Sequence, residues 1–309
     1  MAPVAVVDIG SNSTRLLIAT LEGGRIGELI RRTAVTRLGA GVDATGRLRD
    51  DAVERVLAVL DRYRAEIDAH RCERAVAVMT SAVRDASNGG RLAALVAERH
   101  RLEAHLLTGD EEALMTFLGA TDEHDPDDPV RTLVVDVGGG STELVIGSAG
   151  EVSFHVSTQA GVVRQSERHL RRDPPSGSEL AELRADVDAI LSGAVAPDVR
   201  RGVERGIGVA GTATSLAAIE QRLEPYDPAR VHGHVVSADA INRILEKLAT
   251  LDLAARRAVP GLHPDRAPTI VAGVLILRAA ISLFGLPGIE VSEHDILRGA
   301  IRSLIAPDL

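Results

Sequence analysis

Apolar and polar positions along the chain repeat one short pattern twice. Residues 4–18 read VAVVDIGSNSTRLLI, and residues 132–146 read TLVVDVGGGSTELVI. Each copy has an apolar run, a loop of small and polar residues, and a second apolar run, which predicts two strands joined by a tight turn. The loop residues match as well as the apolar ones do, so the similarity indicates an internal repeat.

The segments that follow each copy continue the resemblance between the two halves. LEGGRIGEL follows the first copy and GSAGEVSFH the second, and each predicts a turn into a third strand. ERAVAVMTSAVRD predicts a strand that runs into a loop, and GIGVAGTATS a strand followed by a glycine turn. Apolar residues at helical spacing predict helices over 50–70, 178–195 and 268–284, and another that begins at Ala238.

The acidic stretch DEHDPDDP, which contains two prolines, separates the two halves. We therefore expect one α/β lobe over 1–125 and a second over 126–309. The final amphipathic segment, SEHDILRGAIRSLIA, is expected to pack back on the first lobe.

Composition limits the partners and the compartment. The 309 residues carry a formal net charge of −9, which argues against nucleic-acid binding because that needs a basic footprint. A single cysteine, Cys72, excludes an intrachain disulfide. The N-terminus lacks the features of a signal peptide, and Arg278 interrupts the longest apolar stretch. These features favour a cytoplasmic protein without a membrane span.

Each repeat places an aspartate at the end of a buried strand, Asp8 in the first copy and Asp136 in the second. The glycines that follow let backbone N–H groups approach phosphate oxygens, the hydroxyl residues add donors, and the aspartate can hold Mg²⁺. One such loop could be a plain hairpin turn, but two equivalent loops favour a phosphate site with one loop on each wall of a cleft. The loops match neither the Walker A pattern nor the dinucleotide fingerprint.

A third phosphate-binding candidate is GIGVAGTATSLAAI, residues 206–219. Gly211 and Thr212 are expected where a helix begins, with backbone N–H groups available to an anion. An ordinary helix cap is the alternative interpretation. His232 and His234, in VHGH, could bind zinc by residue type, but we interpret them as loop or cleft-lining residues.

Seven stretches, in order, resemble the exopolyphosphatase / guanosine pentaphosphate phosphohydrolase (Ppx/GppA) family. They are DIGSNSTR, TSAVRDASN, TGDEEA, DVGGGSTELVIG, GTATSLAAI, VHGHVVS and SEHDILRGAI. The resemblance implies two actin-like (ribonuclease H-like) lobes with a cleft between them. It also implies hydrolysis of the terminal phosphoanhydride of polyphosphate, or of the 5′-phosphate of pppGpp. The chain resembles the short, two-domain form, without a C-terminal helical extension.

The resemblance also implies roles for individual residues. Glu112 is the expected general base, although Glu111 and Glu112 could instead be acids that favour a helix N-terminus. Glu143 is a second catalytic candidate, and Asp8, Asp136 and Glu143 are candidates for holding Mg²⁺ or Mn²⁺; a salt bridge across the hairpin is the alternative for each. The expected phosphate-binding residues are Ser11, Asn12, Ser13, Arg15, Arg84, Gly138, Gly139, Gly140, Ser141, Thr142, Gly211 and Thr212.

Other functions remain open at this point. A sugar or acetate kinase of the same superfamily would need an acceptor site, and a polyphosphate- or nucleotide-binding regulator would need no turnover. The acidic net charge predicts a preference for short polyphosphate, because long chains require an extended basic track. A homodimer could supply that track by joining two clefts.

Overall fold

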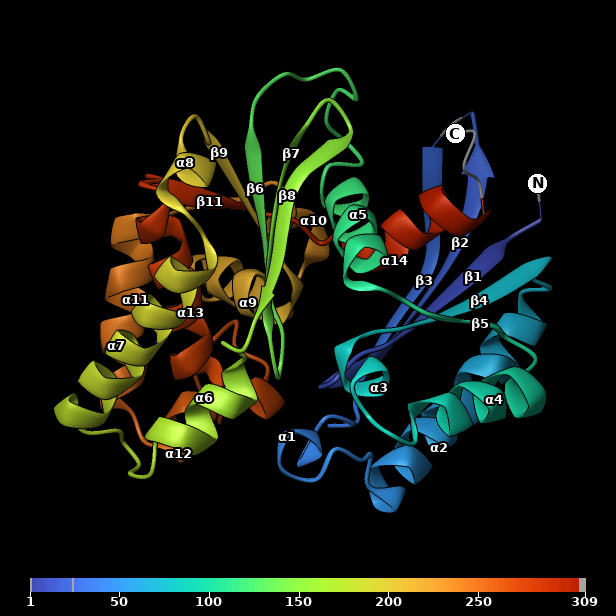
Figure 1. The fold of residues 1–309 in the computed structure, drawn as a ribbon, viewed down its shortest axis with the longest axis horizontal. Helices are drawn as coiled ribbons and strands as arrows, with labels where there is room; N and C mark the ends of the chain where they lie inside the picture. Colours follow the sequence, from blue (N-terminus) through green and yellow to red (C-terminus); the bar gives the residue numbers. More distant parts are fainter. Residues whose placement is uncertain (1, 24, 306–309) are drawn as a thin grey trace. The chain divides into compact units, whose positions relative to one another are not determined.

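The computed structural model describes residues 2–23 and 25–305, which form two compact units (Figure 1). Unit 1 contains the chain up to Asp122 and the described residues from Ile296 onward. Unit 2 contains Glu123–Asp295. The chain therefore passes from unit 1 into unit 2 after Asp122 and returns after Asp295.

Unit 1 is built on a five-stranded sheet in the order β3-β2-β1-β4-β5. β1, β2 and β3 form the expected antiparallel meander, and β4 and β5 continue the sheet in parallel with β1. The strands are β1 (Val4–Ile9), β2 (Ser13–Glu22), β3 (Arg25–Val35), β4 (Arg74–Met79) and β5 (Glu103–Leu106). The helices are α1 (Val42–Thr45), α2 (Asp50–Ala69), α3 (Ser81–Arg84), α4 (Gly89–His100), α5 (Gly109–Ala120), α14 (Ile296–Ala300) and the π-helix η2 (Ile301–Ile305).

Helices cover both faces of the first sheet. The side chains of its central strand, β1, therefore alternate between two cores, one on each face. Val7 of β1 packs in one core with Val56 of α2. Val6 packs in the other core with Met115 of α5 and Leu297 of α14. The last helices of the chain are thus part of the core of unit 1.

Unit 2 contains a six-stranded sheet in the order β10-β11-β9-β6-β7-β8. β6, β7 and β8 repeat the antiparallel meander, and β9 pairs in parallel with β6. The strands are β6 (Thr132–Val137), β7 (Thr142–Ser148), β8 (Glu151–Thr158), β9 (Arg205–Val209), β10 (Val235–Ser237) and β11 (Gly288–Val291). The helices are α6 (Val162–His169), α7 (Gly177–Ala194), α8 (Pro197–Arg200), α9 (Ala210–Gln221), α10 (Pro228–Val231), α11 (Ala238–Thr250), α12 (Leu253–Arg257), the 3₁₀ helix η1 (Pro264–Arg266) and α13 (Ile270–Leu283).

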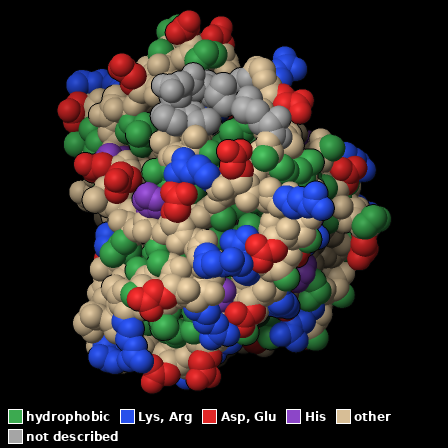
Figure 2. All heavy atoms as spheres, turned by 90° about the vertical axis from the view of Figure 1, so that its right-hand side faces the viewer, with side chains coloured by type: hydrophobic (Ala, Val, Ile, Leu, Met, Phe, Trp, Pro, Cys, Tyr) green, Lys and Arg blue, Asp and Glu red, His purple; other side chains and the backbone are tan. Residues whose placement is uncertain are grey.

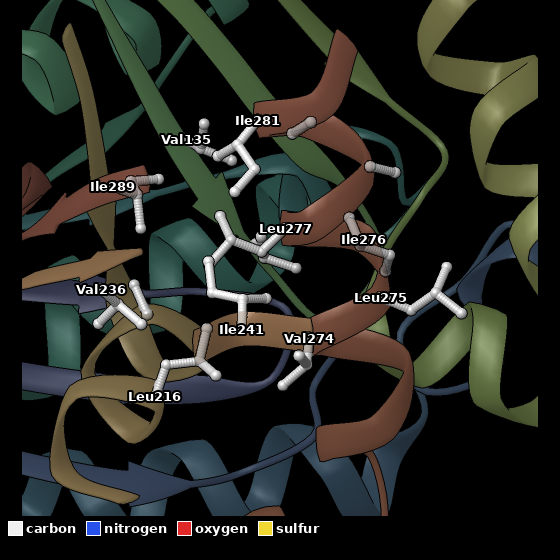
Figure 3. Packing of buried hydrophobic residues seen from close by; sticks show 14 of the residues in the cluster. Val135, Leu216, Val236, Ile241, Val274, Leu275, Ile276, Leu277, Ile281 and Ile289 are labelled. Carbon is white, nitrogen blue, oxygen red and sulfur yellow. The ribbon is translucent and has the colours of Figure 1, made fainter. Parts of the chain in front are cut away.

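The longest apolar stretch of the sequence forms α13, at the centre of the core of unit 2. Its side chains Leu277 and Ile281 lie among Val135 of β6, Ile241 of α11 and Ile289 of β11 (Figure 3). Nearly every residue of α13 is buried, which explains why the helix lacks the polar face of a surface helix. Within the described residues, no helix has the length and apolar character needed to cross a membrane.

Local structure departs from the sequence-based expectations in three places. The segment after β4 forms the short helix α3 and not a loop. No separate glycine turn follows β9, because α9 begins at Ala210, whose φ of +58° turns the chain directly from strand to helix. α6 was not predicted, because eight residues are too few for a clear helical period.

On the face drawn in Figure 2, side chains of both charge signs are interspersed. Lys and Arg side chains lie among Asp and Glu side chains, and no large area of a single charge is visible there. This face therefore differs from the basic track of a polyanion-binding protein.

Candidate phosphate-binding and catalytic site

The first phosphate loop is the tight turn between β1 and β2. Gly10 N donates to Ser13 O (3.0 Å), and the loop carbonyls of Ser11 and Asn12 accept hydrogen bonds from Gly39 N (2.8 Å) and Arg37 N (2.9 Å). Ser11 Oγ also lies 3.1 Å from Ser81 Oγ at the start of α3. These bonds fix the backbone of the loop, while Ser11, Asn12 and Ser13 remain partly exposed to a ligand.

Asp8 and Arg15 face each other across this hairpin. Nη2 of Arg15 lies 2.6 Å from Oδ2 of Asp8, and Nε of Arg15 donates to the same oxygen at 2.8 Å. Asp8 is only 3% exposed, so its carboxylate charge is balanced inside the protein by the guanidinium. A metal ion or a phosphate arriving at this hairpin therefore meets an ion pair and not two separate charges.

The second loop closes in the same way, with Gly138 N donating to Ser141 O (2.9 Å). Its register places Asp136 opposite Glu143, where the first hairpin has Asp8 opposite Arg15. Two carboxylates that face each other across a strand pair offer the oxygen ligands that a hard divalent cation prefers. Glu143 Oε1 accepts a hydrogen bond from Ser157 Oγ at 2.9 Å, which helps to fix the carboxylate on this face of the sheet.

Helix α6 packs directly against the second loop. Val162 N and Val163 N donate to Gly138 O and Gly139 O, both at 2.9 Å. A Cβ on Gly161 would lie 2.2 Å from the carbonyl carbon of Gly140, so only glycine permits this approach. The loop is therefore held between β6, β7 and the beginning of α6.

Arg164 adds a cation to the second loop that the sequence did not indicate. Its Nη2 lies 3.7 Å from the position of a Cβ on Gly140, so the guanidinium lies beside the glycine run. Arg164 belongs to α6, which has only eight residues and therefore shows no clear helical period in the sequence. An arginine at this position can pair with phosphate oxygens through two N–H groups.

Glu112 lies in the first turn of α5 and is 9% exposed. Arg84 Nη1 donates to Glu112 Oε2 at 2.8 Å and to the carbonyl of Leu107 at 3.0 Å. Burial raises the pKa of Glu112, and the Arg84 guanidinium opposes this rise, while the nearby charge of Asp8 adds to it. A buried carboxylate with a raised pKa fits a general base in a phosphoryl-transfer site.

The neighbouring acids have different environments. Glu111 forms a capping box with Thr108: Thr108 N donates to Glu111 Oε2 (2.8 Å), and Glu111 N donates to Thr108 Oγ1 (3.2 Å). Asp110 is exposed. The helix-terminus interpretation thus applies to Glu111, whereas Glu112 turns into the protein toward Arg84.

Gly211 lies at the beginning of α9, beneath Arg266 of η1. A Cβ on Gly211 would lie only 1.0 Å from Nη1 of Arg266, so the guanidinium occupies the space that any side chain would fill. Thr212 is buried in the same turn, and Ser215 Oγ donates to Gly211 O at 2.6 Å. The sequence indicated the glycine but not the arginine, which is distant along the chain.

His232 and His234 do not form a pair. Both lie before β10, outside the strand that would have placed them on one face. His234 Nε2 lies 2.8 Å from Glu220 Oε2, whereas His232 Nε2 lies 3.1 Å from Glu123 Oε2. Their i, i+2 spacing therefore does not create a zinc site from these two residues.

The predicted residues thus fall into separate groups within each unit. Unit 1 contains the first loop, the Asp8–Arg15 pair and the Arg84–Glu112 pair. Unit 2 contains the second loop with Asp136 and Glu143, and the beginning of α9 with Gly211 and Thr212. Unit 1 supplies a buried carboxylate and arginines, and unit 2 supplies facing carboxylates, glycine-rich backbone and an arginine; each set consists of groups that suit phosphate esters and anhydrides.

Comparison with known proteins agrees with this chemistry. Residues 17–305 match the model of the Ppx/GppA phosphatase family. The chain is 36% identical over 314 aligned residues to exopolyphosphatase 2 of Mycobacterium tuberculosis, covering 97% of this chain and 98% of that protein. It is 26% identical to exopolyphosphatase 1 of Mycobacterium bovis, covering 96% of this chain and 87% of the relative.

Solved structures give the same result for the fold. The crystal structure of the Aquifex aeolicus member of the Ppx/GppA family is 31% identical, with a TM-score of 0.85 over 99% of this chain and 98% of that one. An exopolyphosphatase from Cytophaga hutchinsonii is 25% identical, with a TM-score of 0.87 over 99% of this chain and 98% of that one. The expected α/β class with two actin-like lobes is confirmed.

Proposed function

This chain belongs to the Ppx/GppA phosphatase family, and on that premise we propose that it is an exopolyphosphatase, which hydrolyses the terminal phosphoanhydride bond of inorganic polyphosphate. The family membership makes the chain an enzyme that cleaves phosphoanhydrides. Two relatives that align over nearly all of it are named exopolyphosphatases. The observation that carries the proposal is the Arg84–Glu112 pair, which supplies a buried base.

In the proposed reaction, a water molecule attacks the terminal phosphorus while Glu112 accepts its proton. A P–O bond forms, the bond from that phosphorus to the bridging oxygen breaks, and orthophosphate leaves a chain that is one unit shorter. Because phosphoryl transfer is accelerated mainly by positioning and charge stabilisation, the remaining residues act as binders. Arg84 orients Glu112 and is itself within reach of a substrate oxygen when the pair opens.

The two loops would bind the phosphate oxygens through backbone N–H groups and hydroxyls. Ser11, Asn12 and Ser13 serve the first loop, and Ser141 and Thr142 serve the second, together with the glycine run 138–140. Arg15, Gly211 and Thr212 complete the binding set of the proposal, to which we add Arg164 and Arg266 from their positions beside Gly140 and Gly211.

The facing carboxylates of Asp136 and Glu143 fit a hard divalent cation, because such ions prefer carboxylate oxygen ligands. Bound Mg²⁺ or Mn²⁺ would supply Lewis-acid neutralisation of charge on the phosphate chain. Asp8 fits less well, because Arg15 already balances its charge. The proposal therefore assigns the ion to Asp136 and Glu143.

Hydrolysis of pppGpp to release its 5′-phosphate is the second candidate activity, since it breaks the same type of bond. A binding protein without turnover is disfavoured by the presence of Glu112, Asp136 and Glu143. A kinase is disfavoured because the sequence shows no obvious insertion that would bind an acceptor. The proposal also includes a cytoplasmic location, which the composition favours. It includes a homodimer as well, because two chains would offer a longer surface to a polyanionic substrate.

Phosphate release from short polyphosphate, long polyphosphate and pppGpp, each with Mg²⁺ and with Mn²⁺, tests the proposal. We expect release from polyphosphate that needs one of the two ions. Release from pppGpp alone would replace the first candidate by the second. Tight binding of all three substrates without any release would favour a regulatory role, and phosphoryl transfer from ATP to a small acceptor would favour a kinase.

A further inference from the structure

Glu123, His232 and His294 bring one carboxylate and two imidazoles together in unit 2. A ligand atom from each residue lies within 4.8 Å of the ligand atoms of the other two. Among the side chains that the structure describes, no other group of three His, Cys, Asp or Glu residues is gathered this closely. None of the three belongs to the phosphate loops or to the Arg84–Glu112 pair.

The two oxygens of one carboxylate face two different rings. Oε2 of Glu123 lies 3.1 Å from Nε2 of His232, and Oε1 lies 3.9 Å from Nδ1 of His294. The two imidazole rings pack against each other with their centroids 4.2 Å apart and their planes inclined by 34°. The space bounded by these nitrogen and oxygen atoms is therefore lined by ligand atoms on three sides.

The backbone holds the two histidines in place. Gly233 N donates to Val291 O (2.8 Å) and Val291 N donates to His234 O (2.9 Å), which joins the segment of His232 to the segment of His294. Ser292 Oγ accepts from His294 N at 3.0 Å. The two rings are thus preorganised, while the Glu123 side chain, 59% exposed, can adjust and leaves a path from solvent.

We propose that Glu123, His232 and His294 form a binding site for a divalent transition-metal ion of the zinc type. Two imidazoles and one carboxylate are a common set of three protein ligands for Zn²⁺, with water in the fourth position. Imidazole also favours Co²⁺, Ni²⁺ and Cu²⁺, whereas Mg²⁺ prefers an all-oxygen environment. The site therefore differs in ligand chemistry from the carboxylate pair assigned to Mg²⁺ or Mn²⁺.

The hydrogen bonds of His232 indicate which ions can bind. Its Nδ1 accepts from Glu293 N at 3.2 Å, so the neutral ring carries its proton on Nε2, facing Glu123. An ion that binds Nε2 requires the other neutral tautomer, in which the single ring proton lies on Nδ1, so the ring gives up the bond from Glu293 N. Only an ion with a strong affinity for imidazole compensates for this loss, which excludes Mg²⁺.

An ion bound at this site would also stabilise the fold of unit 2. Glu123 is the first residue of unit 2, and His294 is the last but one. An ion held by both cross-links the beginning and the end of the unit. Because the ion binds the folded chain in preference to the unfolded chain, it raises the melting temperature, by an amount that grows with the logarithm of its concentration once this exceeds Kd.

Titration of the full-length protein with Co²⁺, in excess Mg²⁺ and without substrate, tests the proposal. Excess Mg²⁺ occupies the oxygen sites, and visible absorption reports Co²⁺ bound with nitrogen ligands. We expect one absorbing site per chain, displacement of Co²⁺ by Zn²⁺, and an increase in melting temperature with Zn²⁺. Since even an outer-shell partner typically contributes roughly 10–100-fold to metal affinity, His294→Ala should weaken binding by at least about tenfold.

His234→Ala is the matched control, because His234 comes from the same loop but pairs with Glu220. It should retain Co²⁺ binding, and Glu123→Gln should weaken it. His294→Gln, which keeps a polar side chain of similar size, replaces His294→Ala if that variant fails to fold. Absence of nitrogen-ligated Co²⁺ in the wild type, or equal binding by wild type and His294 variants, would overturn the proposal. The measurement uses no substrate, so its result is independent of the proposed hydrolysis.

Discussion

Arg84 donates a 2.8 Å hydrogen bond through Nη1 to Oε2 of Glu112, and the same nitrogen donates to the carbonyl of Leu107. The second bond fixes the guanidinium on the end of the segment that leads into α5. The arginine can therefore both hold the buried carboxylate in one orientation and limit the rise of its pKa.

Replacing Glu112 by glutamine should remove most turnover without unfolding the chain. The amide keeps the shape of the side chain but cannot accept the proton of the attacking water. We expect kcat to fall about 10²–10⁴-fold, as for other general bases. Steady-state phosphate release measures the effect, and circular dichroism checks the fold.

Glu111→Gln makes the same chemical change one residue earlier. Glutamine preserves the capping box with Thr108, so this variant should keep both its fold and its turnover. Equal losses in the two variants, or full turnover in a folded Glu112→Gln protein, would remove Glu112 from the role of base.

Replacing Arg84 by methionine should shift the acid limb of the pH–rate profile to higher pH. The guanidinium lowers the pKa of Glu112 against the effect of burial; without it, burial and the charges of Asp8 and Asp85 act alone and the pKa rises. Because a base must be ionised to act, activity should then be lost at a higher pH as the solution is acidified. The profile of kcat against pH measures this.

Arg99→Met serves as the control for the Arg84 variant. Arg99 lies on α4 and pairs with Asp61, so its removal should leave the acid limb unchanged. An acid limb that stays in place or moves to lower pH in Arg84→Met would show that Arg84 does not tune the catalytic base.

Adding one methyl group to Gly211 should displace Arg266 and weaken substrate binding. The Cβ of Gly211→Ala would overlap the Arg266 guanidinium, which must move away from the beginning of α9. Because the overlapped atoms are the far end of a flexible side chain, the free energy of unfolding should change by less than about 1 kcal/mol. We expect KM for polyphosphate to rise, while urea denaturation shows a stability close to that of the wild type.

The double variant Gly211→Ala/Arg266→Ala should bind polyphosphate no more weakly than Arg266→Ala alone, because the methyl group acts only by displacing the guanidinium. Gly193→Ala is the matched control, since a Cβ at that helical position meets no atom within 4 Å. It should leave KM unchanged and stabilise the chain by up to about 1 kcal/mol. An unchanged KM in Gly211→Ala would contradict the assignment of Arg266 to substrate binding.

Removing one of the two facing carboxylates should raise the Mg²⁺ concentration that is needed for activity. Chelation of divalent ions should abolish turnover of the wild type, and Asp136→Asn should raise the half-saturating Mg²⁺ concentration by at least about tenfold. Glu151→Gln, on the exposed edge strand β8, removes a carboxylate outside the pair and should leave that concentration unchanged. Identical Mg²⁺ curves for Asp136→Asn and the wild type would place the ion elsewhere.

The charge of the chain predicts its preferred substrate length. The net charge is −9, and on the face drawn in Figure 2 cations are interspersed with anions and form no continuous basic track that a long polyanion could follow. We expect short polyphosphate to be preferred at equal chain-end concentration, with activity that falls only modestly between low and moderate salt. Processive degradation of long chains with a steep salt dependence would contradict this, and the oligomeric state should be measured in the same buffer.

The sequence by itself determined the parts of this protein that depend on local periodicity. Two apolar runs flanking a loop of small residues specify a hairpin wherever they occur, so the repeat predicted both meanders and placed Asp8 and Asp136 at strand ends. Similarly, the unbroken apolar character of α13 predicted a buried helix, because no polar face was left for solvent.

Only the tertiary structure decided which charged groups meet. Arg84 reaches Glu112 across 28 residues, and His232 reaches Glu123 across 109, at positions that no local period relates. Arg266 covers Gly211 because η1 packs beside α9, and a glycine in the sequence does not reveal which side chain occupies its free space. Local patterns record the preferences of one element for strand, helix or turn, whereas contacts between distant side chains depend on how all the elements of a unit pack into one core.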